Sequence, residues 1–288
     1  MSQKTLSGLM LTLGLISAPV FAADAAPAAP ASPHTFTGNV TLASEYLYRG
    51  IAQTRGNSAI QGGFDYSHAS GLYAGTWASN ISWISDSVNG AVANQSTTSS
   101  LEIDVYGGYK GSISSDLGYD VGVLTYNYPG SGKTVSGFQQ LNQDTTELYG
   151  ALSWKWLSLK YSHSTTALFG WAKNNGAAPN TLNDKTTGSG YLELNAAYDL
   201  GNGWGINGHM GNQKVKGYGD ASYSDYKLGV TKDLGFGTVG LAYSTTNAKD
   251  NCSNSGNSNP YCYVMGTNAN NKYEAGKDRA VLTFTKTF

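Results

Sequence analysis

The sequence predicts an all-β protein, a single transmembrane antiparallel β-barrel of about 12 strands with short periplasmic turns and longer external loops. Three observations predict it. Segments of about ten residues alternate apolar and polar side chains, the connections between them are alternately short and long, and the chain ends in the aromatic residue Phe288. Only 13% of the residues are charged, and no stretch after the N-terminus is apolar for long enough to form a membrane helix.

The alternation is clear in the first segment, residues 36–49. One face carries mostly apolar side chains, namely Phe36, Gly38, Val40, Leu42, Tyr46 and Tyr48. The other face carries polar side chains, namely Thr37, Asn39, Thr41, Glu45 and Arg49. Because side chains on a strand alternate with a period of two, the first set is expected to face lipid and the second a wet lumen.

The same period recurs along the chain. Further strands are expected at residues 60–66, 73–81, 101–109, 118–128, 145–154, 157–166, 190–199, 204–213, 223–232, 237–246 and 277–288. Tyr73, Trp77 and Ile81 form the apolar face of their segment, whereas both faces of 118–128 carry Tyr and aliphatic residues. An even number of strands places both termini on the periplasmic side.

The connections sort by length. Short turns are expected at residues 68–71, 110–116, 155–156, 200–203 and 233–237. Longer polar segments alternate with them, at residues 50–58, 84–100, 129–144, 167–189, 214–222 and 247–276. Tight turns at one end and long loops at the other are typical of an outer-membrane barrel, whereas a soluble β-sandwich has no reason to sort its loops in this way.

The two ends of the chain indicate export and assembly. Lys4, the apolar run 6–16 and the small residues of Val20-Phe21-Ala22 predict a signal peptide over residues 1–22. An Ala/Pro-rich periplasmic tether is expected over 23–34 and the barrel over 35–288. The terminal Phe288 resembles the C-terminal signal of assembled barrels, so outer-membrane lipid and the barrel-assembly machinery are the expected partners in the cell outer membrane.

Aromatic side chains are expected to form two girdles at the membrane interfaces. Those near the periplasmic strand ends are Tyr109, Tyr119, Tyr198, Trp204, Phe236 and Phe284. Those near the external ends are Tyr46, Tyr48 and Trp83. High β-propensity explains the same residues equally simply, so the girdles are only supporting evidence for the barrel.

Sites for chemistry are scarce in the sequence. Cys252 and Cys262 are close together in a polar segment and are expected to form a disulfide in an oxidising compartment. The four His residues are scattered, no nucleophile motif is present, and we expect no cofactor and no metal site. The net charge of -1 argues against nucleic acid as a partner.

Charged residues on the predicted inner face are the candidate site. The expected pore-lining residues are Glu45, Arg49, Asp65, Glu102, Asp104, Glu147, Lys160, Glu193, Asp225, Lys227 and Arg279. Charged rings inside a pore select ions, and this acidic excess favours cations. The alternative, which the sequence leaves equally open, is that these charges pair with one another and fill space.

Several segments resemble a known family. The stretch Ser44-Glu45-Tyr46-Leu47-Tyr48-Arg49-Gly50-Ile51-Ala52-Gln53-Thr54 resembles the TorF porin family, and the resemblance continues through residues 60–67, 71–77, 102–109 and 128–130. It implies a Gram-negative outer-membrane barrel with a poorly defined substrate and brings no catalytic residues. The cysteine-bearing loop and residues 174–185 are not features that the resemblance explains.

These observations lead to one leading hypothesis and two alternatives. The leading hypothesis is a porin-like channel for passive diffusion of small hydrophilic solutes, with a mild preference for cations. The first alternative is a closed barrel that binds a partner or surface through its external loops, which is favoured if the inward charges pair and block the bore. The second is a barrel-embedded enzyme, which needs a Ser and a His within hydrogen-bond reach on the wall.

Overall fold

Twelve strands close into one antiparallel barrel in the computed structural model, which describes residues 32–88, 99–131, 134–135, 138–139, 142–171, 186–253, 259–264 and 271–288. The barrel strands are β1 (His34–Ala43), β4 (Ala59–His68), β5 (Leu72–Asn80), β6 (Leu101–Ser112), β7 (Leu117–Asn127), β10 (Thr145–Trp154), β11 (Leu157–Ser164), β12 (Gly190–Gly201), β13 (Trp204–Lys214), β14 (Tyr223–Asp233), β15 (Thr238–Thr246) and β18 (Arg279–Thr287). Each pairs with its neighbour along the chain, and β1 pairs with β18 to close the barrel.

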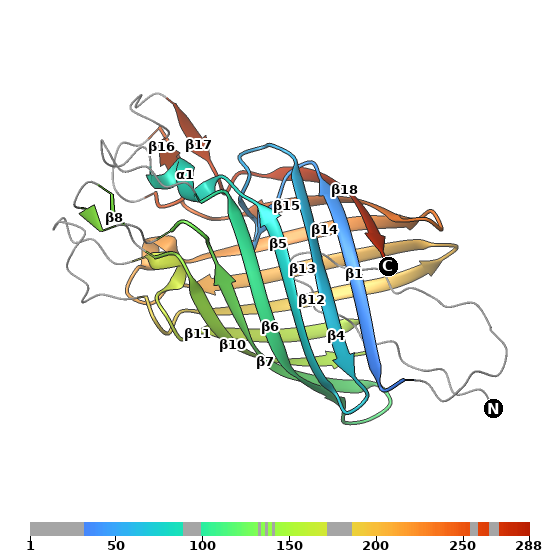
Figure 1. Ribbon diagram of the computed structural model, residues 1–288. Helices are drawn as coiled ribbons and strands as arrows, with labels where there is room; N and C mark the ends of the chain where they lie inside the picture. Colours follow the sequence, from blue (N-terminus) through green and yellow to red (C-terminus); the bar gives the residue numbers. More distant parts are fainter. Residues whose placement is uncertain are drawn as a thin grey trace.

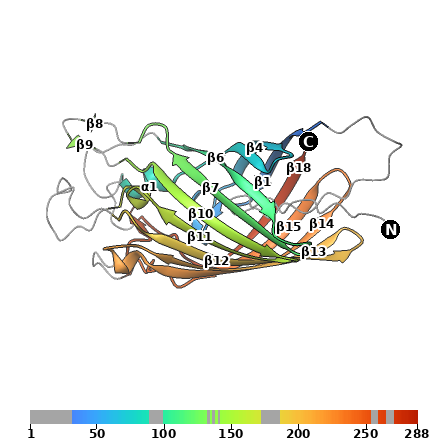
Figure 2. The ribbon, with the colours of Figure 1, turned by 90° about the horizontal axis from the view of Figure 1, so that it is seen from below.

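Smaller elements gather at one end of the barrel. They are β2 (Leu47–Tyr48), β3 (Ile51–Ala52), α1 (Trp83–Val88), β8 (Thr134–Val135), β9 (Phe138–Gln139), η1 (Leu168–Gly170), η2 (Gly219–Ala221), β16 (Cys262–Val264) and β17 (Lys272–Glu274). Figures 1 and 2 show α1 and β8 at the end opposite the C-terminus. We call this the long-loop end and the other the short-turn end. No described helix is long and apolar enough to cross a membrane.

The barrel wall is apolar outside and polar inside. Phe36 is 75% exposed and Leu228 is 63% exposed, although both are large apolar side chains. The side chains of Glu102 and Asp225 face inward and are almost fully buried. A water-soluble domain has the reverse distribution, because it buries apolar surface and exposes charge.

The predicted short turns and long connections are confirmed by the strand bounds. Two strand assignments differ. The first strand ends at Ala43, not at residue 49, and β5 points Tyr73 and Trp77 into the barrel rather than toward its outer face. The ambiguous strand β7 points Leu124 and Tyr126 inward.

The predicted signal peptide, residues 1–22, lies outside the described residues, as does nearly all of the predicted tether. The barrel begins at His34 with β1.

The disulfide between Cys252 and Cys262 links two points of the connection between β15 and β18, with Cα atoms 5.2 Å apart. Replacing both residues with Ser is expected to destabilise this loop by roughly 2–4 kcal/mol. The reason is that the cross-link restricts the unfolded loop, which therefore loses less entropy when it folds. Limited proteolysis should therefore cut residues 247–278 faster in the variant, while the barrel strands stay protected. Unchanged cleavage relative to a Ser253→Ala control would contradict this expectation.

Candidate functional site: the barrel interior

One side of the barrel interior is filled by tyrosines and carboxylates from β4, β5, β6, β7 and β10. The Tyr73 hydroxyl donates to Asp120 at 2.5 Å and also bonds to the Tyr149 hydroxyl. The Tyr106 hydroxyl donates to Asp65 at 2.5 Å. Each carboxylate thus gains a buried donor, and the rings occupy space that would otherwise hold water.

Glycines on the neighbouring strands make room for these rings. A Cβ atom at Gly75 would lie 2.5 Å from the Tyr106 ring, and one at Gly108 would lie 2.5 Å from the Tyr73 hydroxyl. Glycine within a strand often marks such a close approach. This is the sequence signal that would have placed Tyr73 in the interior, where the alternation had already placed Tyr106.

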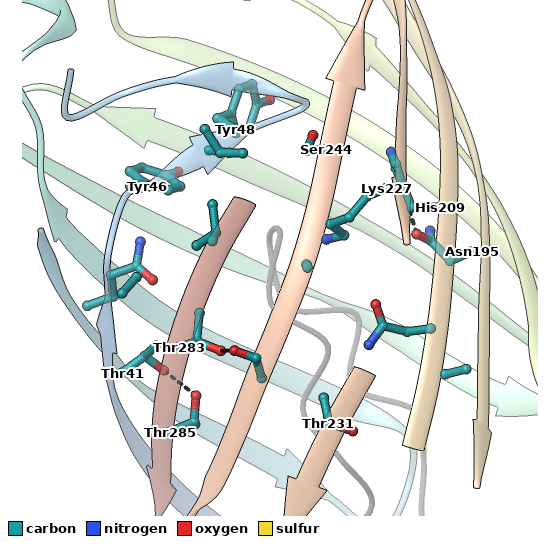
Figure 3. A pocket seen from close by; sticks show the side chains of 18 of the residues that line it. Thr41, Tyr46, Tyr48, Asn195, His209, Lys227, Thr231, Ser244, Thr283 and Thr285 are labelled. Atoms are coloured by element: carbon teal, nitrogen blue, oxygen red, sulfur yellow. Dashed lines mark hydrogen bonds between the residues drawn. The ribbon is translucent and has the colours of Figure 1, made fainter. Parts of the chain in front are cut away.

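The other side of the interior is hollow. A cavity of about 280 Å³ lies against β1, β18, β15, β14, β13, β12 and β11, and we call it the chamber. One wall carries hydroxyl groups from Thr41, Thr231, Thr283 and Thr285. Figure 3 shows Thr41, Thr283 and Thr285 on one side of the chamber, with Asn195, His209 and Lys227 across from them.

The second wall of the chamber carries a belt of alternating charges. Lys160 on β11 pairs in register with Glu193 on β12, with an Nζ–Oε1 distance of 3.8 Å. On the next strands, His209 Nε2 lies 2.9 Å from Asp225 Oδ1, and Lys227 is the register partner of His209. Because acidic and basic groups lie side by side, most of their fields cancel within the wall.

A hairpin formed by β2 and β3 folds into the barrel from the end of β1. Its two-residue turn consists of Arg49 and Gly50, both with positive φ (47° and 77°). This is the turn geometry that tight hairpins favour. At the base of the hairpin, the backbone N–H of Gln53 donates to the backbone carbonyl of Tyr46, so the paired segment is longer than the two short strands.

Arg49 fastens the hairpin tip to the far wall. Its guanidinium donates to both carboxylate oxygens of Glu147, at 2.7 and 3.0 Å, and to Gln213 at 2.8 Å. It also lies 4.1 Å from the centre of the Tyr191 ring. Burial by itself lowers the pKa of Arg49, but Glu147 together with Tyr48 and Tyr126 more than offsets this, so the pKa lies well above its ordinary value. The tip therefore carries a permanent buried ion pair.

These contacts carry the hairpin across the bore. Glu147, Tyr191 and Gln213 belong to β10, β12 and β13, which lie across the barrel from β1 in the strand order. At the near wall, the Tyr46 hydroxyl donates to Glu102 at 2.7 Å, and Glu45 pairs with Arg279 at 3.3 Å. The hairpin is thus anchored on both walls.

The long-loop side of the hairpin is packed with aromatic rings. Trp83, Tyr128, Phe169, Trp171, Tyr261 and Tyr263 line a second cavity of about 40 Å³ there. Tyr48 lines both this cavity and the chamber. The hairpin therefore separates two internal spaces, one small and aromatic and the other larger and polar.

The predicted external girdle is wrong. Tyr46, Tyr48 and Trp83 lie inside the barrel mouth and not on its outer surface. For the two tyrosines, the reason is that the chain turns inward after Ser44, whose side-chain oxygen accepts a hydrogen bond from the Leu282 backbone N–H of β18. Trp83 begins α1, which follows β5. At the short-turn end the exposed aromatics agree with the prediction, and they include Tyr109, Tyr198, Trp204 and Phe236.

The structure places the predicted charged residues in three groups. Those joined in ion pairs are Arg49 with Glu147, Glu45 with Arg279, and Lys160 with Glu193, and Asp225 is within hydrogen-bond distance of His209. Glu102 and Asp104 are buried beside the hairpin, and neither Asp104 carboxylate oxygen has a hydrogen-bond partner. Asp65 and Lys227 line the chamber. Glu45 and Arg49 belong to the inserted segment and not to the wall. That these groups line a conducting path stays a prediction.

Among the residues that the structure describes, no group of three or more His, Cys, Asp or Glu side chains is arranged to hold a metal ion.

A family model with the description "Bacterial protein of unknown function (Gcw_chp)" matches residues 27–288. The chain belongs to the Gcw_chp family. This assignment does not carry the TorF name that the sequence motifs suggested. No curated protein matches the sequence.

Solved structures with a similar fold include three outer-membrane proteins. The KdgM porin in complex with disordered oligogalacturonate has a TM-score of 0.45 and 8% identity, over 88% of this chain and 98% of that chain. The NanC porin has a TM-score of 0.44 and 10% identity, over 88% and 99%. An outer membrane channel from Pseudomonas putida F1 has a TM-score of 0.44 and 10% identity, over 92% and 100%. At these scores the likeness carries no argument about function.

Proposed function

We propose that the protein resides in the bacterial outer membrane and forms a narrow channel for passive diffusion of small hydrophilic solutes. The observation that carries this proposal is the closed barrel with an apolar outer wall and a polar, hollow interior. Closure leaves no unpaired strand edge in the lipid. Twelve strands lie between the eight that side chains fill and the sixteen that leave an open bore.

The hairpin is the constriction in this proposal. It crosses the bore at the long-loop end and separates the chamber from the aromatic cavity. The mild cation preference belongs to the same proposal and is supported by the excess of acidic over basic residues among those predicted to line the bore. Cleavage of residues 1–22 and recognition of the strand ending in Phe288 by the assembly machinery belong to the same proposal.

Planar lipid bilayers test the channel. The purified protein is expected to give small conductance steps, and a variant with residues 45–53 replaced by a Gly/Ser linker of equal length is expected to give steps several-fold larger. Circular dichroism and resistance to unfolding in cold detergent establish that both proteins are folded barrels. Reversal potentials in a KCl gradient report the cation preference. Absence of conductance and of solute flux from both folded proteins would overturn the channel.

A second function is favoured by the ion pairs in the interior. Four of the predicted pore-lining acids are paired with bases, and the hairpin spans the bore. A barrel closed in this way would act through its long loops, as a binding or surface protein. Binding to cells or surfaces that persists when neither the natural protein nor the linker variant conducts would support this second function.

A further inference from the structure

We propose that the chamber binds an uncharged, hydroxyl-rich solute with a ring of about the size of one sugar unit. This inference deepens the proposed channel and rests on it, because it names the class of solute that the channel would take up. Four features of the chamber support it: its volume, the chemistry of its two walls, two buried polar atoms without hydrogen-bond partners, and the aromatic rings at its hairpin end.

The volume limits the size of the ligand. The chamber measures about 280 Å³. An apolar cavity of about 150 Å³ holds one benzene molecule, and pockets for drug-sized ligands begin near 300 Å³. One six-membered ring with its substituents fits between these limits.

The hydroxyl wall can both donate and accept hydrogen bonds. Thr41 and Thr285 already bond to each other at 2.8 Å, and either hydroxyl can serve as the donor. Thr231 and Thr283 extend this wall toward β14. Such hydroxyls adjust their rotors to the partner they meet, and they offer no net charge to compensate an ionic group.

The charge belt opposite favours an uncharged ligand as well. Glu193 has Lys160 beside it, and Asp225 accepts hydrogen bonds from Tyr191 as well as facing His209. A neutral hydroxyl can donate to these carboxylates or accept from Lys160 without disturbing the pairs. A charged solute at this belt would lose its water next to acids whose partners are already in place, which is costly.

Two buried polar atoms provide an independent observation. Gln61 and Ser158 both line the chamber, with only 3% and 2% of their surfaces exposed. The Gln61 Oε1 and Ser158 Oγ atoms have no hydrogen-bond partner in the structure. Unsatisfied buried polar groups are rare and destabilising in folded proteins. Hydroxyl groups of a ligand are the kind of hydrogen-bond partner that these two positions lack.

Aromatic side chains close the chamber at the hairpin. Tyr46, Tyr48 and Trp77 all line it, and Tyr46 packs edge-on against Trp77 with ring centres 5.4 Å apart. Figure 3 shows Tyr46 and Tyr48 together at one end. Mixed aromatic and polar linings are common in small-molecule sites, and here the C–H face of a sugar ring can pack on the aromatic rings while its hydroxyls reach the walls.

Isothermal titration calorimetry of the folded protein in detergent micelles tests the solute class. The probes are glucose, glucuronate and glucosamine, which share one ring and differ in charge. Glucose is expected to bind about tenfold more tightly than either charged sugar, because it leaves no unpaired charge in the chamber. Equal or tighter binding of a charged sugar, or no binding of glucose, would overturn the inference.

Variants locate the binding to the chamber. Gln61→Leu and Thr231→Val keep side-chain size and each remove one polar group from the lining, so each is expected to weaken glucose binding about fivefold. Gln61→Leu also removes an unsatisfied buried acceptor, so the barrel should remain folded. The control is Thr125→Val, whose side chain is on the outer face of β7 and does not line the chamber; it should leave the affinity unchanged. Loss of affinity in the control equal to that in the two chamber variants would contradict the assignment.

The micelle experiment is independent of conductance. If the protein binds glucose selectively but does not conduct, the proposed solute class stands and the proposed channel is overturned. If the protein conducts but binds all three sugars with equal affinity, the proposed channel stands and the proposed solute class is overturned.

Discussion

Replacing Glu147 with Gln is expected to loosen the hairpin and raise single-channel conductance several-fold. Glu147 and Arg49 are both almost fully buried, with side chains 2% and 8% exposed. The substitution leaves the guanidinium without its counter-charge, and losing one partner of a buried pair typically costs about 3–5 kcal/mol. Urea unfolding in lipid vesicles measures the loss of stability, and planar bilayers measure the conductance.

A second variant distinguishes the effect of losing the ion pair from a non-specific loss of stability. Arg49→Met combined with Glu147→Gln removes both charges, so it should recover most of the lost stability while conductance stays high. With Arg49→Met alone as the fourth corner, the comparison is a double-mutant cycle for this pair. Lys277→Ala, at an exposed ion pair with Glu274, is the matched control and should change neither quantity. Unchanged conductance in Glu147→Gln would show that the hairpin does not limit flow.

Gly50→Ala is expected to prevent the hairpin tip from docking. A Cβ atom at Gly50 would lie 2.5 Å from Thr246 Cγ2 and 2.9 Å from Asp225 Cβ, too close for real atoms. Its φ of 77° adds the strain that any L side chain meets in the left-handed region, on the order of 1 kcal/mol. We expect higher conductance and a lower midpoint of urea unfolding.

Gly56→Ala is the matched control for the steric part of this effect. Gly56 also has a positive φ, at 72°, but nothing lies within 4 Å of a Cβ placed there. This variant carries the backbone strain without the clash, so its conductance should equal that of the natural protein. If Gly50→Ala and Gly56→Ala behave alike, contact of the tip with β14 and β15 is not what holds the hairpin.

The barrel was predictable because its signals are local. A period of two assigns residues such as Phe36 and Leu228 to one face from their neighbours alone. Loop length is equally visible in the sequence, and it orders the strands as hairpins in chain order around the barrel. The register of these pairs then follows from the short turns.

The hairpin was not predictable by the same reasoning. Tyr46 and Tyr48 continue the alternation of β1, and a period of two does not distinguish a strand in the wall from a strand folded into the lumen. The Arg49-Gly50 turn was the available local signal. The position of the turn inside the bore depends on Glu147 of β10, to which Arg49 donates. Glu147 is almost one hundred residues away, and nothing in the sequence connects it to Arg49.

The sequence by itself determined the closed barrel, its strand order and the polar character of its interior, because period and loop length are properties of neighbouring residues. Only the tertiary structure decided how that interior is filled. The Tyr73 ring fits inside because Gly108 on the adjacent strand leaves room for it. Arg49 meets Glu147 because closure of the barrel brings distant strands together. The hairpin, the chamber and the buried Arg49–Glu147 pair are consequences of that closure.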